Sequence, residues 1–321
     1  LVEHDRAIDP LPFEDLGWGF YQVEWTVPRG VALSFAEAIV VVEDDAGNLS
    51  ETAALGTVTV ISDANRLERL SGANRYATAV RISQSGWRQA DTVVIARGDH
   101  YADALAGVSL AHQFDAPILL TPSNSLPQLV ADEIERLEAK RAIILGGEKA
   151  VSPQVEQRLA GLGLVVERVG GENRYDTARH IARMVAPLGA EQAVLASGAS
   201  FADALAIGAF AAANHWPVLL TSPGTLSKET DEALADLGVQ EVLLVGGHAA
   251  ISQRVENGLK AKKLDTRRIG GKDRYATSVE AARELGNVFS HLYVTTGEDY
   301  ADALTGAVLA AKRGTGLILV K

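Results

Sequence analysis

Three arginine–tyrosine pairs are the residues of this sequence whose types and surroundings most directly suggest chemistry. They stand in the strings RLSGANRYATA, RVGGENRYDTA and RIGGKDRYATS, which begin at Arg69, Arg168 and Arg268. In each string a glycine allows a tight turn, and the Asn or Asp that follows is typical of a helix N-cap. The arginine would then lie in the first helical turn, where the helix dipole disfavours a cation unless a partner compensates it. The pairs are Arg75 and Tyr76, Arg174 and Tyr175, and Arg274 and Tyr275.

A recurrent aspartate is the first candidate for that partner. It stands in the strings YADAL, FADAL and YADAL, as Asp103, Asp203 and Asp302. Two hypotheses remain open: the arginine forms a salt bridge with this aspartate, or the arginine and the helix N-terminus bind an anionic ligand directly. Both hold if the aspartate orients the arginine. The aspartate itself is either a helix cap or an acid that contacts ligand hydroxyls or an ammonium group. We interpret the tyrosines as packing groups with a hydrated hydroxyl.

The remaining motifs indicate no catalytic or cofactor site. The Gly-Gly pairs at 146–147 and 246–247 favour a turn over a phosphate cradle, since neither a Walker nor a GxGxxG pattern is present. No HExxH or GxSxG motif occurs, and the sequence has no cysteine. The histidines at 100, 112, 215 and 248 stand at positions that the other copies fill differently. We therefore expect no catalytic residue, no metal and no cofactor.

The motifs recur at a spacing of about 100 residues, which defines tandem modules. The strings ending APILLT and WPVLLT, and the strings ILGGEKAVS and LVGGHAAIS, keep the same spacing. We place the modules at residues 67–166, 167–266 and 267–321. The third lacks the half that carries the Gly-Gly turn, so either it continues beyond this sequence or a partner completes it.

Each module alternates short apolar segments with helical patterns, which predicts an α/β fold with parallel sheets. In the first module we expect strands at 92–96, 118–120 and 142–145, and helices at 101–112 and 126–138. Ser152 followed by Pro153 indicates the start of a further helix. In such sheets ligands bind at the carboxyl ends of the strands.

Residues 1–66 differ from the modules in pattern and charge. Strands are expected at 21–27, 39–42 and 57–61, with a turn at 44–48, and the segment resembles the last strands of a bacterial immunoglobulin-like domain. It holds twelve acidic residues against three arginines, whereas the whole chain has a formal net charge of -11. The modules therefore carry a balance of only about -2, which allows local binding of anions but disfavours non-specific nucleic-acid binding. No run of about 18 apolar residues and no signal peptide is visible, so no membrane partner is expected.

The four recurring motifs resemble those of the cell-wall-binding repeat type 2 family, over residues of about 67–321. The resemblance implies Toprim-like, flavodoxin-like three-layer modules packed around a pseudo-threefold axis. It also implies a secreted protein at the cell surface of Gram-positive bacteria, anchored without covalent bonds to an anionic, teichoic-acid-like wall polymer. Arg75, Arg174, Arg274, Asp103, Asp203 and Asp302 match the family's characteristic residues. The alternatives are a phosphoesterase or nuclease, which would need clustered acids for Mg²⁺, and a protein-binding surface array.

Overall fold

The computed structural model describes residues 68–284 and 292–321, together with short strands before residue 68. The chain divides into an N-terminal unit that ends at Arg69 and a second unit that begins at Leu70. The described strands of the first unit form antiparallel pairs. They are β1 (Val2–Glu3) with β2 (Arg6–Ala7), β3 (Phe13–Gly17) with β4 (Phe20–Val23), and β5 (Ile39–Glu43) with β6 (Leu49–Ala53).

These pairs test part of the prediction for residues 1–66. The strand expected at 39–42 is confirmed as β5, and the one expected at 21–27 coincides with β4 as far as Val23. Residues 24–27, 44–48 and 57–61 lie outside the described residues. Pairs of two strands do not support an immunoglobulin-like sandwich, which stays a prediction.

Two complete parallel sheets form the first and second modules, and this confirms the predicted α/β fold class. The first sheet has the order β10-β9-β7-β8 and the second the order β14-β13-β11-β12, so corresponding strands occupy corresponding places. Apart from β10 and β14, which carry charged residues, these strands are rich in buried apolar residues because helices cover both faces. The strands are β7 (Thr92–Arg97), β8 (Ile118–Thr121), β9 (Arg141–Leu145), β10 (Val165–Val169), β11 (Gln192–Ser197), β12 (Val218–Thr221), β13 (Glu241–Val245) and β14 (Asp265–Ile269).

The helices begin largely where the sequence indicates. The side chains of Asn74 and Asn173 accept hydrogen bonds from the second and third backbone amides of their helices, as predicted for N-caps. Pro153 opens its helix as predicted, although the Ser152 hydroxyl makes no capping bond. The helices are α1 (Arg75–Gly86), α2 (Gly107–Gln113), α3 (Gln128–Arg136), α4 (Pro153–Gly161), α5 (Arg174–Val185), α6 (Ala202–Ala213), α7 (Lys228–Asp236), α8 (Gln253–Ala261), α9 (Arg274–Glu284) and α10 (Ala301–Lys312).

One helix start differs between the copies. The sequence predicts a helix from Tyr101, but α2 begins at Gly107. Before it lies a turn in which the Ala104 amide donates to the Tyr101 carbonyl and the Gly107 amide donates to the Ala104 carbonyl. The corresponding helices α6 and α10 begin at Ala202 and Ala301. Asp203 and Asp302 therefore lie in a first helical turn, whereas Asp103 lies in the turn before α2.

The third module contains the equivalents of the first two strands and first two helices. Its strands β15 (Tyr293–Thr296) and β16 (Leu317–Val320) are parallel. Within the described ranges no strand pairs with the other edge of β15, although β7 and β11 are paired on both edges. Val294 is accordingly 52% exposed, whereas its counterparts Ile95 and Leu195 are fully buried.

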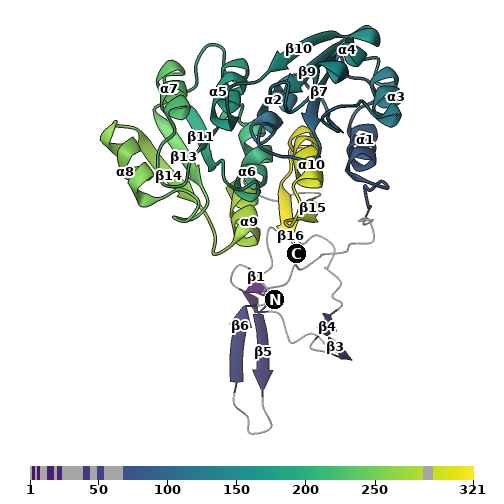
Figure 1. The fold of residues 1–321 in the computed structure, drawn as a ribbon. Coiled ribbons are helices and arrows are strands. Elements are labelled where there is room, and N and C mark those ends of the chain that lie inside the picture. The colour runs from purple at the N-terminus through teal and green to yellow at the C-terminus, as the bar shows by residue number, and fades with distance from the viewer. Residues whose placement is uncertain are drawn as a thin grey trace. The chain divides into compact units, whose positions relative to one another are not determined.

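The modules pack through their second helices, which lie together at the centre of the second unit (Figure 1). Helices α2, α6 and α10 contact one another in pairs. Each also packs on the first helix of another module: α2 on α5, α6 on α9, and α10 on α1. The packing thus closes into a ring through α9 and α10 of the third module. Gly208 of α6 faces Val108 of α2 so closely that a Cβ would lie 3.2 Å from the valine side chain.

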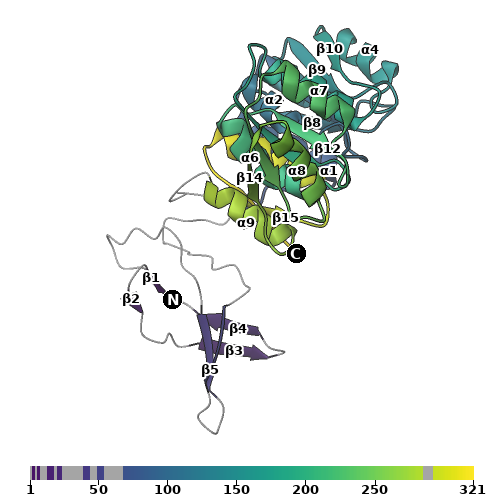
Figure 2. The same cartoon turned by 90° about the vertical axis from the view of Figure 1, so that its left-hand side faces the viewer.

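The second module shows the layers clearly, and Figure 2 looks onto its outer helices α7 and α8. Val194 and Ala196 of β11 join the large core cluster that also contains residues of α2, α6 and α10. The alternate residues Ala193 and Leu195 join a separate cluster with side chains of α7 and α8. This alternation is what a strand covered on both faces requires. No helix in the described part of the chain is long and apolar enough to cross a bilayer.

Candidate functional site at the module interfaces

Each recurrent arginine is the first residue of its helix and is held by a backbone carbonyl. The Nη1 groups of Arg75, Arg174 and Arg274 donate to the carbonyl oxygens of Gly98, Gly198 and Gly297, the last at 2.7 Å. Each of these glycines directly follows the first strand of the same module. The carbonyl dipole compensates the unfavourable place of the cation at a helix N-terminus. The three guanidinium groups therefore stand at the carboxyl ends of the strands, where the topology predicts a site.

An aromatic ring from another module lies beside each guanidinium. The Cζ atom of Arg75 is 5.6 Å from the centroid of the Tyr300 ring, that of Arg174 is 5.9 Å from Tyr101, and that of Arg274 is 5.4 Å from Phe201. These are distances at which a cation interacts with a π face. Every site is therefore shared, with the arginine from one module and the ring from its neighbour.

The three rings also contact each other. Their centroids are 5.5 Å apart for Tyr101 and Tyr300, 5.6 Å for Tyr101 and Phe201, and 6.1 Å for Phe201 and Tyr300. The Tyr300 hydroxyl donates to the Gly98 carbonyl at 2.6 Å, and burial raises the pKa of Tyr300 to about 12. We call Tyr101, Phe201 and Tyr300 the aromatic triad. Sequence reasoning did not single out these rings, although an aromatic residue precedes Ala-Asp-Ala-Leu in all three copies.

The recurrent aspartates do not form the salt bridges that the first of the two open hypotheses expects. In the described residues none of the three arginines has an ion pair with Asp103, Asp203 or Asp302; Asp103 instead accepts a hydrogen bond from the Thr177 hydroxyl at 2.8 Å, across the interface of the first two modules. Burial raises the pKa of Asp203, and the positive charge of Arg274 opposes this effect. Burial and the charge of Asp299 raise the pKa of Asp302, against the effect of Arg75. The arginines thus act on these carboxyl groups across module boundaries without direct contact.

The Gly-Gly turns leave room for these aspartates. Gly146 and Gly246 both have φ +96°, which confirms the turn interpretation. A Cβ on Gly146 would lie 2.9 Å from an oxygen of Asp103, and a Cβ on Gly246 would be closer still to Asp203. The third module has no described Gly-Gly turn beside Asp302.

The tyrosines after the arginines pack on the strand ends. A Cβ on Gly98, Gly198 or Gly297 would lie within 2.6 to 2.7 Å of the Cε1 atom of Tyr76, Tyr175 or Tyr275 respectively. The predicted role as packing groups therefore agrees with their position. These glycines are required so that the tyrosine ring and the arginine can both approach the carbonyl.

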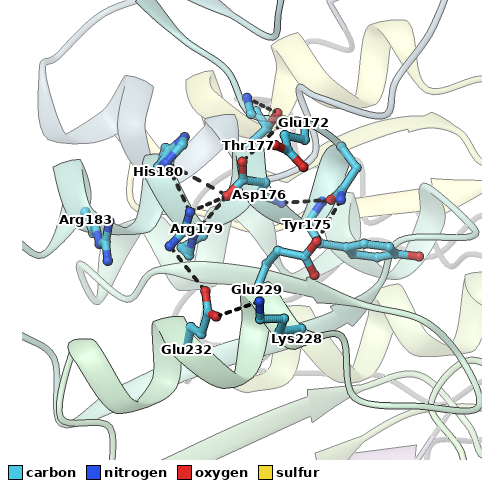
Figure 3. Close-up of polar contacts among 12 residues, drawn as sticks. Glu172, Tyr175, Asp176, Thr177, Arg179, His180, Arg183, Lys228, Glu229 and Glu232 are labelled. Carbon is cyan, nitrogen blue, oxygen red and sulfur yellow. Dashed lines mark hydrogen bonds and ion pairs between the residues drawn. The ribbon is translucent and has the colours of Figure 1, made fainter.

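A second polar cluster belongs to the second module alone (Figure 3). Arg179 donates to Asp176 at 2.9 Å and 2.6 Å and pairs with Glu232 at 3.4 Å, while Lys228 pairs with Glu232 at 3.6 Å. Burial would raise the pKa of Asp176, but hydrogen bonds from the Glu172 amide and from Arg179 lower it below its usual range. The other modules have alanine and valine where this one has Asp176 and Arg179. We therefore interpret the cluster as a link between α5 and α7.

No group of three or more histidine, aspartate or glutamate side chains in the described ranges is arranged to hold a metal ion. His100 stacks on Tyr101 with ring centroids 5.3 Å apart, and His112 lies 5.9 Å from His215. These histidines belong to different surroundings and form no repeated site.

Comparison with known proteins identifies the family to which the repeats are similar. The profile of the cell wall binding domain 2 (CWB2) family matches residues 69–156, 168–256 and 268–321. The chain is 36% identical over 261 residues to the N-acetylmuramoyl-L-alanine amidase LytC of Bacillus subtilis (strain 168), covering 81% of this chain and 51% of the amidase. It is 34% identical over 255 residues to the amidase enhancer of the same organism, covering 79% of this chain and 34% of the enhancer.

Solved structures agree with this assignment. Cwp6 from Clostridium difficile superposes with a TM-score of 0.74 at 26% identity, over 88% of this chain and 45% of Cwp6. Cwp8 from the same organism gives a TM-score of 0.71 at 31% identity, over 78% of this chain and 44% of Cwp8. The chain thus spans about half the length, or less, of the relatives it matches. From its three matched repeats, its fold and these relatives, the chain belongs to the cell wall binding domain 2 family.

Proposed function

We propose that the three modules hold a secreted surface protein to the wall of a Gram-positive bacterium by binding an anionic, teichoic-acid-like polymer. The observation that carries the proposal is the ring of guanidinium groups at the strand ends, each at a boundary between two modules. Arginine suits carboxylate and phosphate groups because its planar donors fit them in pairs. Family membership supports the wall as the surface that is bound.

The proposed modules are residues 67–166, 167–266 and 267–321, preceded by an immunoglobulin-like segment at 1–66. We assign the arginines to the anionic groups of the polymer, the aspartates to its hydroxyl groups, and the tyrosines to shaping the site. The proposed ligand-binding residues are Arg75, Tyr76, Asp103, Arg174, Tyr175, Asp203, Arg274, Tyr275 and Asp302.

Repetition of the site suits a polymer. Several weak contacts on one rigid body gain avidity when the ligand repeats along its length. The near-neutral balance of the modules means that binding depends on local arginines and not on the field of the whole protein.

Sedimentation with purified cell walls tests this function. We expect the protein to sediment with intact walls and to remain in solution once the anionic polymer has been removed chemically. Equal sedimentation before and after removal would contradict the proposal. We also propose binding without catalysis, and metal-dependent hydrolysis of a phosphodiester by the purified protein would contradict that part.

A charge-matched pair of variants tests the site. Arg174→Gln removes a guanidinium beside the aromatic triad, whereas Arg183→Gln removes one from the other end of the same helix, where it pairs with Asp236. We expect Arg174→Gln to weaken wall binding about tenfold, as loss of a charge-assisted contact implies. Arg183→Gln should change it less than twofold, and equal losses would indicate a non-specific charge effect. Circular dichroism checks that both variants are folded.

A further inference from the structure

The residue before each ring of the aromatic triad differs between the three interfaces. It is His100 before Tyr101, Ser200 before Phe201 and Asp299 before Tyr300. These positions correspond, because each lies three residues after the last residue of the first strand of its module. The guanidinium-to-ring distances of 5.4 to 5.9 Å are also alike, so the three interfaces have similar geometry.

At the interface between the third and first modules, the arginine forms an ion pair with a carboxylate of the protein itself. Nη2 of Arg75 lies 3.1 Å from Oδ2 of Asp299. The other oxygen of Asp299 accepts the backbone amide of Tyr300 at 2.7 Å, which fixes the carboxylate in place. Nη1 of Arg75 donates to the Gly98 carbonyl and lies 3.2 Å from the Tyr300 hydroxyl. The donors of this guanidinium are therefore largely used within the protein.

At the other two interfaces the arginine has no such partner. In the described part of the chain, Arg174 and Arg274 each make one hydrogen bond, to the carbonyls of Gly198 and Gly297, and no ion pair. Asp99, one residue before His100, is held by Arg97 and does not compensate Arg174. The Nη2 groups of Arg174 and Arg274 thus have donors that no described side chain accepts.

We propose that Asp299 takes, at the third interface, the place that an anionic group of the ligand takes at the other two. The molecule then has two open oxyanion sites, Arg174 with Tyr101 and Arg274 with Phe201, and a third that the protein closes itself. The ligand group that fits is a carboxylate or a phosphate, because Asp299, which takes its place at the third interface, is a carboxylate bound by one guanidinium. This inference rests on the proposed function and refines it from three equivalent sites to two.

The chain offers its own matched substitutions. Asp299→Ser gives the third interface the residue of the second, and Ser200→Asp gives the second the residue of the third. We expect Asp299→Ser to strengthen binding at least about fivefold through a third site. We expect Ser200→Asp to weaken it about tenfold, the same loss that we expect for Arg174→Gln. In the double variant that combines Asp299→Ser with Arg75→Gln, we expect the gain in binding to disappear.

Binding is measured to purified walls and to two soluble probes, polyglycerol phosphate and polygalacturonate, which present phosphate and carboxylate groups. Preference for one probe identifies the oxyanion. Asp299→Asn, which keeps the size of the side chain and an acceptor for the Tyr300 amide, should strengthen binding in the same direction as Asp299→Ser. This second variant guards against a loss of folding in the first, and thermal melts followed by circular dichroism check all variants.

The outcomes separate this inference from wall binding itself. Unchanged or weaker binding in both Asp299 variants, or no loss in Ser200→Asp, overturns the inference even if the wild type binds walls. If the variants rank as expected on the soluble probes while no protein sediments with walls, the two-site assignment stands and the wall function fails. Wild-type protein that binds neither walls nor probes overturns both.

Discussion

Glu256 shows how a single carboxylate supports the fold outside the binding site. It accepts hydrogen bonds from Lys260 at 2.6 Å and Arg268 at 2.8 Å, and these contacts, with Lys260 first, lower its pKa from 4.5 to about 2. A carboxyl group whose pKa is lower in the folded state stabilises the fold above its unfolded pKa and loses that effect as the pH falls. This contribution is therefore complete above about pH 4.5 and disappears towards pH 2.

Glu256→Gln tests this assignment. We expect the variant to lose about 1–3 kcal/mol of unfolding free energy at pH 7, since the pKa change is discounted for the solvent around Lys260. Its stability should also fall less steeply than that of the wild type between pH 4.5 and pH 2. Denaturant unfolding across this range measures both effects. Glu156→Gln is the control: Glu156 pairs with Arg168 but has Ala160 in place of a lysine, so its loss should be smaller.

Asp203 illustrates the opposite effect. Burial raises its pKa, so the folded state holds its proton more tightly than the unfolded chain, and the stability that this adds is lost as the pH rises through the folded pKa. Above its folded pKa, the ionised Asp203 carboxylate therefore lowers the stability of the fold. We expect Asp203→Asn to raise the melting temperature at pH 7 while weakening wall binding. A lower melting temperature together with unchanged binding would contradict both roles.

At the scale of the element, the Gly-Gly turn requires glycine at its first position only. Gly246 has φ +96° and an added Cβ would lie 2.8 Å from the Cβ of Ala250, whereas Gly247 has no atom within 4 Å of such a Cβ. We expect Gly246→Ala to lower the free energy of unfolding by about 1–3 kcal/mol, because of backbone strain and close contact with Asp203. Gly247→Ala should be nearly neutral. Thermal denaturation compares the two, and equal losses would contradict this account of the turn.

The elements themselves follow closely from the sequence. Buried β-branched segments became the central strands, and Asn74 and Asn173 cap their helices, because these features depend on residues that are neighbours in the chain. The start of α2 at Gly107 was not predicted from the Ala-Asp-Ala-Leu string, since the same string begins a helix at once in α6 and α10.

The site was predicted less well, because its contacts cross module boundaries. Aligning the copies shows which residues recur, but it does not show that Arg174 lies beside Tyr101 of the preceding copy. Asp103 and Asp203 recur just as regularly, yet they face the Gly-Gly turns and not the arginines. Only the packing of α2 on α5 and of α6 on α9 decides which residues meet.

At the scale of the whole molecule, the central helices make the three modules one folding unit. One core cluster contains Val108, Ile207 and Leu309, a fully buried residue from each module. We expect residues 68–321 to unfold in a single transition, observed by calorimetry and by the tryptophans Trp87 and Trp216 of different modules. Separate unfolding transitions for the two tryptophans would contradict the expectation of a single folding unit.

Leu309→Ala tests the same expectation from the third module. Leu309 is fully buried, and a Cβ on Gly86 of the first module would lie 2.7 Å from its side chain. We expect the free energy of unfolding to fall by about 2–5 kcal/mol, and the unfolding signals of all modules to shift together. Leu188→Ala is the control, because Leu188 is fully exposed and its truncation should leave the melting temperature unchanged.

The sharing of each site between neighbouring modules has a consequence for how such a protein changes over generations. If the ring were built from three identical subunits, any mutation beside the aromatic triad would appear at all three boundaries at once. A single chain that carries all the copies can alter one boundary and inherit the others intact. Asp299, Ser200 and His100 show this freedom: one gene holds three versions of a single position. Selection could therefore adjust the number of working sites one at a time.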